Sequence, residues 1–114
     1  MSHAFMCLAC FVGLMIASPV AAQTQGQVDR GMKLFGEQKC SMCHSIAGKG
    51  NAKGVLDQVG GKLSADEIRQ WLVDPEAMRK KHNAERKPLM KSYKTLSKED
   101  LDGLVAYLQT LKGK

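Results

Sequence analysis

Residues 40–44 read Cys-Ser-Met-Cys-His, a C-x-x-C-H pattern. Two cysteines three positions apart on a helical turn face the same side, so their thiols point in one direction. The next residue, His44, then presents an imidazole nitrogen close beside them. This spacing is the attachment signature of c-type haem, in which both thiols bond one porphyrin edge and the histidine binds iron.

Other chemistries also use closely spaced cysteines. A dithiol redox centre expects a βαβ context, and no strand pattern is visible in this sequence. A zinc site needs four ligands in suitable pairs. The chain after residue 22 offers four, Cys40, Cys43, His44 and His82, but its two histidines lack the close H-x₃₋₅-H spacing of such a site. A disulfide between the two cysteines would close too small a loop to stabilise much. Covalent haem is therefore the favoured interpretation.

A haem iron can take a second axial ligand, and methionine opposite histidine is the arrangement typical of electron transfer. Met32 lies on an apolar helical face and is expected in the core, while Met42 lies between the attachment cysteines. Met90 sits in a proline-containing loop that can present its sulfur to iron. The residues alone favour Met90, with Met78, His82 and an open site as alternatives.

The first 22 residues differ from the rest of the chain. Residues 4–17 are apolar apart from one glycine, Pro19 follows, and the first 22 positions contain no Asp, Glu, Lys or Arg. This pattern predicts a signal peptide over residues 1–22, although its start lacks the usual positive charge, so an uncleaved membrane anchor is the alternative. Cys7 and Cys10 lie inside this segment and are expected to be removed with it.

Charge is unevenly distributed along the chain. The 17 Lys and Arg residues outnumber 11 Asp and Glu residues, giving a net charge of +6. Eight of the basic residues and a single acid fall between Arg79 and Lys98. A basic surface attracts acidic proteins, nucleic acid or anionic membrane, but the near absence of interleaved aromatic residues argues against nucleic acid. The alternatives left are an acidic partner, an anionic membrane and a merely solvated surface.

Apolar spacing and capping residues predict three helices, over residues 28–39, 64–74 and 97–113. Ser64 with Glu67 and Ser97 with Asp100 are the capping patterns, and Gly113 marks the expected end of the last helix. Residues 23–27 are expected to form a mobile polar lead-in, residues 48–61 a glycine-rich loop, and residues 76–96 mostly loop with a short helical turn near Met78.

Over nearly all of residues 28–111, the chain resembles the class I c-type cytochromes, particularly short bacterial ones. Residues 30–35 (RGMKLF) are similar to the first helix of that family, residues 63–75 to its middle helix, and residues 96–108 to its C-terminal helix. The resemblance implies an all-α cytochrome c fold over residues 28–114, with about three main helices around one covalently bound haem.

The resemblance also assigns roles to individual residues. It implies that the first and last helices cross, with Gly31 and Phe35 packing on Tyr107. The family's axial methionine lies about six residues before the Leu-Ser of the last helix, a position that Met90 occupies, although Lys91 follows it where many relatives have proline. Further haem contacts are implied for Trp71 and Tyr93 through the propionates, and for Pro88 and Leu89 on the ring.

Together these features predict a periplasmic, single-haem electron carrier that serves redox partner proteins. No second catalytic constellation is visible, neither paired carboxylates, a Ser-His-Asp set nor a glycine-rich phosphate loop, so we do not expect an enzyme. The alternatives are a cytochrome subunit of a larger oxidoreductase and a haem sensor with a labile Met90 ligand. Stable membrane insertion is expected only if the signal peptide is not cleaved.

Overall fold

The computed structural model describes residue 13 and residues 24–113. Apart from Gly13, the predicted signal peptide, with Cys7 and Cys10, therefore lies outside the described residues. The described part is mostly helical, as predicted, with one two-stranded hairpin that the sequence did not predict. In chain order the elements are α1 (Gln25–Glu37), η1 (Cys40–Met42), β1 (Ser45–Ile46), β2 (Lys49–Gly50), η2 (Ala52–Gly54), α2 (Val59–Lys62), α3 (Ala65–Val73), α4 (Pro75–Lys81) and α5 (Lys98–Gln109).

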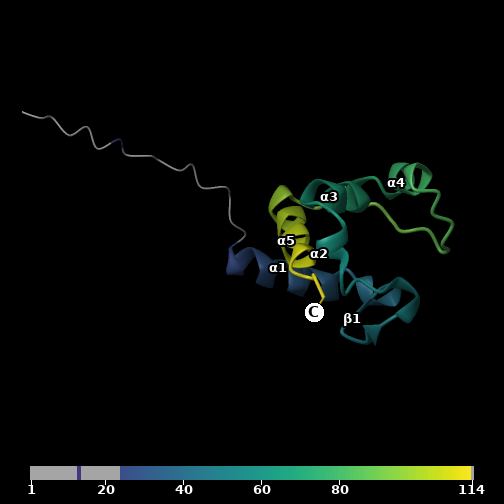
Figure 1. Cartoon of the computed structure of the whole chain (residues 1–114), viewed down its shortest axis with the longest axis horizontal. Helices are drawn as coiled ribbons and strands as arrows, with labels where there is room; N and C mark the ends of the chain where they lie inside the picture. Colours follow the sequence, from purple (N-terminus) through teal and green to yellow (C-terminus); the bar gives the residue numbers. More distant parts are fainter. Residues whose placement is uncertain (1–12, 14–23, 114) are drawn as a thin grey trace, which may run out of the picture.

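Helices α1 and α5 pack directly against each other (Figure 1). At the contact, Gly31 leaves no room for a side chain: a Cβ there would overlap the carbonyl oxygen of Gly103 and lie 2.6 Å from the Cβ of Tyr107. One turn further on, the rings of Phe35 and Tyr107 meet edge to face, with centroids 6.0 Å apart. The predicted crossing of the first and last helices is confirmed.

Helix α1 begins earlier than the sequence predicts. The Thr24 hydroxyl accepts the backbone N–H of Gln27, and the Gln27 side chain accepts the backbone N–H of Thr24, both at 3.1 Å. This capping box starts the helix at Gln25, so the prediction of a mobile lead-in over 23–27 is wrong for its last three residues. Met32 is 53% exposed, because α5 covers the side of α1 that carries Gly31; its assignment to the core is also wrong.

The capping patterns of the other two long helices are confirmed. Ser64 and Glu67 form a reciprocal capping box at the start of α3, and the Ser97 hydroxyl accepts the Asp100 N–H at the start of α5. Helix α5 ends at Gln109, well before Gly113, where the sequence predicts its end. At this point the Thr110 hydroxyl donates a 2.6 Å hydrogen bond to the carbonyl of the preceding turn.

Between α3 and the loop that follows lies α4, which is longer than the single turn predicted near Met78. Asp74 closes α3 and at the same time accepts the N–H of Ala77, while Pro75 occupies the first position of α4. Within the described residues, no helix is long and apolar enough to cross a lipid bilayer. The hydrophobic core joins α1, α3 and α5 through Leu34, Ile68, Leu72, Tyr93, Leu101, Leu104, Val105 and Leu108.

Candidate haem site

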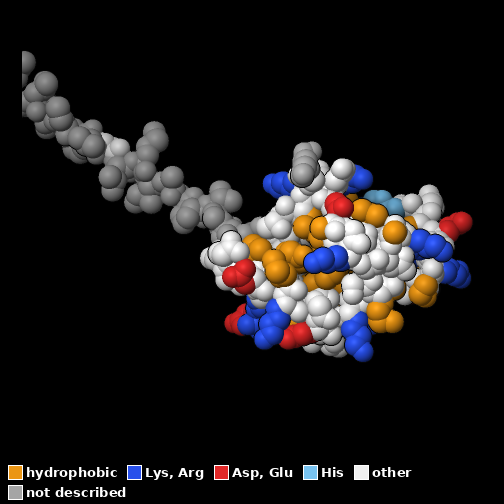
Figure 2. Space-filling model, turned by 90° about the horizontal axis from the view of Figure 1, so that it is seen from below, with side chains coloured by type: hydrophobic (Ala, Val, Ile, Leu, Met, Phe, Trp, Pro, Cys, Tyr) orange, Lys and Arg blue, Asp and Glu red, His pale blue; other side chains and the backbone are white. Residues whose placement is uncertain are grey.

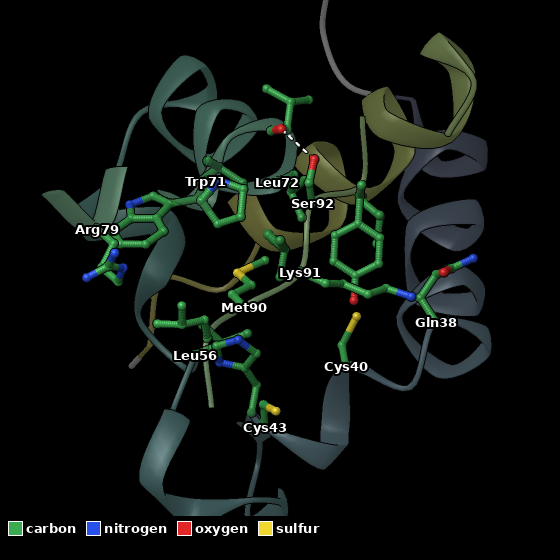
Figure 3. Close-up of a pocket in the computed structure, with 18 of the residues that line it drawn as sticks. Gln38, Cys40, Cys43, Leu56, Trp71, Leu72, Arg79, Met90, Lys91 and Ser92 are labelled. Carbon is green, nitrogen blue, oxygen red and sulfur yellow. Dashed lines mark hydrogen bonds between the residues drawn. The ribbon is translucent and has the colours of Figure 1, made fainter. Parts of the chain in front are cut away.

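A cavity of about 980 Å³ opens beside this core (Figure 3). Its volume lies at the upper end of the usual range for small-molecule sites, roughly 300–1,000 Å³. Apolar side chains from α2, the loop before it, α3 and α5 form much of the cavity wall: Leu56, Val59, Ile68, Leu72, Leu104 and Leu108. The residues predicted from sequence to hold a haem all line this one cavity: Cys40, Cys43, His44, Trp71, Pro88, Met90 and Tyr93.

The two cysteines are brought to the cavity by a single 3₁₀ turn. Lys39 adopts a left-handed conformation (φ 56°) that turns the chain out of α1 and into this segment. The Cys40 carbonyl then accepts the N–H groups of Cys43 and His44, at 3.1 and 2.9 Å. Both thiols are free and half-buried, and Figure 3 shows them at the same end of the cavity.

The imidazole of His44 is held by the backbone of η2. Its Nδ1 lies 3.1 Å from the carbonyl oxygen of Gly54, and a proton on Nδ1 in this hydrogen bond leaves the Nε2 lone pair for a metal. Burial lowers the pKa of His44, which favours the neutral form that binds iron. Glycine is required at position 54, since a Cβ would lie 2.8 Å from Nδ1 and overlap the Cys43 carbonyl oxygen.

Met90 reaches the cavity from the loop between α4 and α5. Figure 3 shows its thioether directed into the cavity, between the cysteine thiols and Trp71. Directly after Met90 the loop is anchored to the end of α3: the Ser92 hydroxyl donates to the Val73 carbonyl at 2.6 Å, and the Tyr93 N–H donates to the Leu72 carbonyl at 2.7 Å.

The structure does not bring the other candidate ligands to the cavity. Met78 is only 3% exposed but is not among the residues that line it. His82 is exposed at the end of α4, and its ring stacks on that of Trp71 with centroids 5.9 Å apart. Within the described part of the chain, no three His, Cys, Asp or Glu side chains gather as they would around a metal ion.

Tyr93 lies at the attachment end of the cavity and is only 8% exposed. Its hydroxyl and the Cys40 thiol are neighbours that influence each other's ionisation. Burial, together with the neighbouring Cys40, raises the pKa of Tyr93 to about 12. Burial also raises the pKa of the Cys40 thiol. The Tyr93 hydroxyl therefore lies near Cys40 at the cavity, and its contact with a propionate stays a prediction.

Arg79 is a further cavity residue, which the sequence identifies only as the first member of the basic run from Arg79 to Lys98. Its Nε is buried and has no hydrogen-bond partner among the described residues. Figure 3 shows its side chain next to Trp71, also at the cavity. A buried guanidinium N–H without a partner is costly, and a carboxylate would satisfy it. A haem carries two propionate carboxylates, so this end of the cavity fits the group.

The comparisons with known proteins agree with this geometry. The family model described as Cytochrome c matches residues 28–112, so the chain belongs to the cytochrome c family. Membership of this family implies a haem c cofactor and a role in electron transfer.

Among the curated proteins, the chain is similar to cytochrome c oxidase subunit 2 of Alkalihalophilus pseudofirmus, with 26% identity over 106 residues. The match covers 85% of this chain but only 29% of that relative. No solved structure matches the chain significantly.

Proposed function

We propose that this protein is a single-haem electron carrier in which Cys40 and Cys43 attach the haem and His44 and Met90 bind its iron. The observation that carries the proposal is the meeting of two distant segments, 40–44 and the Met90 loop, at one largely apolar cavity. When bound, haem supplies an iron that changes by one electron between ferric and ferrous forms.

Hydrogen bonds within the chain hold His44 and Met90 in place, so these two ligands would move little when the iron gains or loses an electron. Gly54 holds the His44 ring, and the hydrogen bonds of Ser92 and Tyr93 hold the loop that carries Met90. The thioether of Met90 favours the ferrous state and so raises the reduction potential. Arg79 and Trp71, which both line the cavity, would donate hydrogen bonds to the propionates, while the apolar wall would exclude water from the ring.

The mouth of the cavity has the character of a docking surface for an acidic redox partner. Met42 and Leu89 both line the cavity and are 70% and 52% exposed. Basic side chains that line the same cavity are Lys39, Arg79, Arg86, Lys91 and Lys94. On the face shown in Figure 2, exposed apolar side chains lie among both basic and acidic side chains. Positive charge around an apolar contact steers acidic partners and loses strength as salt increases.

The apolar N-terminal segment, residues 1–22, supports export and hence a periplasmic location, since haem attachment of this kind takes place outside the cytoplasm. A second candidate function is that of a cytochrome subunit in a larger oxidase complex. It is favoured by the similarity to an oxidase subunit over 85% of this chain. Purification from native membranes distinguishes the two, because a subunit stays in a stable complex and a diffusible carrier does not.

Absorption spectroscopy of the protein expressed with a haem maturation system tests the proposal. We expect a c-type reduced spectrum and, in the ferric form, the weak long-wavelength charge-transfer band of methionine ligation. The band should vanish in Met90→Ala and persist in Met78→Ala. Covalent haem without the band would exclude Met90 as ligand, and absence of covalent haem would refute the proposed function.

A further inference from the structure

Arg86 joins the Met90 loop to the haem-attachment segment. Its Nη2 donates a 2.5 Å hydrogen bond to the carbonyl oxygen of Cys43, the residue that directly precedes His44. The guanidinium also packs against Gly54, where an added Cβ would overlap Nη1. Arg86 thus contacts the two backbone segments that position the His44 imidazole.

Along the chain, Arg86 precedes Met90, whereas the other residues that anchor this loop follow Met90. Ser92 and Tyr93 tie the chain after Met90 to α3. Over the described residues 85–91, the bond from Arg86 to Cys43 is the one hydrogen bond to another element. The segment from Arg86 to Met90 is therefore anchored at its start by the bond of Arg86 to Cys43. Just after its end, the bonds of Ser92 and Tyr93 anchor it to α3.

We propose that Arg86 is a positioning residue that keeps Met90 on the haem iron by tethering its loop to the Cys43 backbone. The inference rests on the proposed function, because it needs His44 and Met90 to be the axial ligands. A planar guanidinium offers several N–H groups in a rigid fork, so Nη2 can bond the Cys43 carbonyl while Nη1 lies against Gly54. A lysine ammonium would keep the charge but lose that fork.

The test uses the haem-loaded full chain with the variants Arg86→Gln, Arg86→Lys and Lys87→Gln. The last is the matched control, since it removes one positive charge from the neighbouring, exposed position in the same loop. The probe is carbon monoxide, which binds ferrous iron once Met90 leaves. We expect at least tenfold faster binding in Arg86→Gln, equivalent to 1.36 kcal/mol, an intermediate rate in Arg86→Lys, and less than a twofold change in Lys87→Gln.

The reduction potential provides a readout that a purely structural role would not move. Weaker methionine ligation disfavours ferrous iron, so Arg86→Gln should lower the equilibrium constant for reduction at least threefold, about 28 mV for one electron. Equal rates and potentials in Arg86→Gln and Lys87→Gln would overturn the inference. If Arg86→Gln does not acquire haem, Arg86→Lys provides the test. A carbon monoxide binding rate and a reduction potential like those of the wild type would then refute the inference about Arg86. Loss of methionine ligation already in the wild type would instead refute the proposed function.

Discussion

The contact of α1 with α5 at Gly31 provides a sharp test of the fold. In Gly31→Ala the added methyl group would lie 2.5 Å from the carbonyl carbon of Gly103 and 2.6 Å from the Cβ of Tyr107. Carbon atoms approach favourably to about 3.5–4.0 Å, so α5 would have to move by about 1 Å. Gly103 contributes backbone atoms, which cannot rotate away, and the shift would also disturb the Phe35–Tyr107 ring contact.

The size of the effect follows from two opposing contributions. Overpacking costs about 1–3 kcal/mol, and the upper end applies because helix backbone has to move. Alanine is the better helix former by about 1 kcal/mol, so the net loss in the free energy of unfolding is about 2 kcal/mol. For a domain of this size that corresponds to a decrease in Tm of roughly 8–16 °C.

Thermal unfolding of the haem-loaded protein, followed by circular dichroism, measures this loss. Gly36→Ala is the matched control, because it makes the same substitution in the same helix at a site with nothing within 4 Å of the new Cβ. It should raise the stability by up to about 1 kcal/mol. A Gly31→Ala protein as stable as the wild type would show that the helices separate without cost and would refute the reasoning.

Two further predictions concern a charged cluster and the methionines. Hydrogen bonds from Lys98 and then Arg69 lower the pKa of Asp102 below 3.8, so its contribution to stability is present above that pH and is lost as the pH falls through the lowered value. Asp102→Asn should therefore have a lower Tm than the wild type at neutral pH, and its Tm should fall less steeply below about pH 4. Curves of Tm against pH that run parallel for the two proteins would contradict this. Met78→Ala should cost about 2–5 kcal/mol in urea unfolding and the exposed Met32→Ala less than about 0.5; equal midpoints would disprove the burial argument.

Much of the site could be predicted from the sequence because its chemistry is local. The spacing of Cys40, Cys43 and His44 places them close together whatever the rest of the chain does. In the structure a 3₁₀ turn begins at Cys40, and Cys43 and His44 directly follow it beside the cavity. The starts of α3 and α5 were equally predictable, since Ser64 and Ser97 cap helices through residues three positions away. The start of α1 carries the same kind of signal, Thr24 with Gln27 three positions later, but the prediction followed the apolar face of the helix, which begins only at Val28.

Only the tertiary structure decided which distant side chains reach the cavity. The sequence favours Met90 as the ligand but leaves Met78 and His82 open as alternatives. In the structure the path of the loop brings Met90 to the cavity, while Met78 is buried away from it. Arg79 and Arg86 belong to the same basic run, yet one has a buried Nε without a partner and the other bonds the Cys43 carbonyl. Periodicity and capping depend on neighbours along the chain, whereas these roles depend on which backbone segments meet in space, which composition and spacing do not specify.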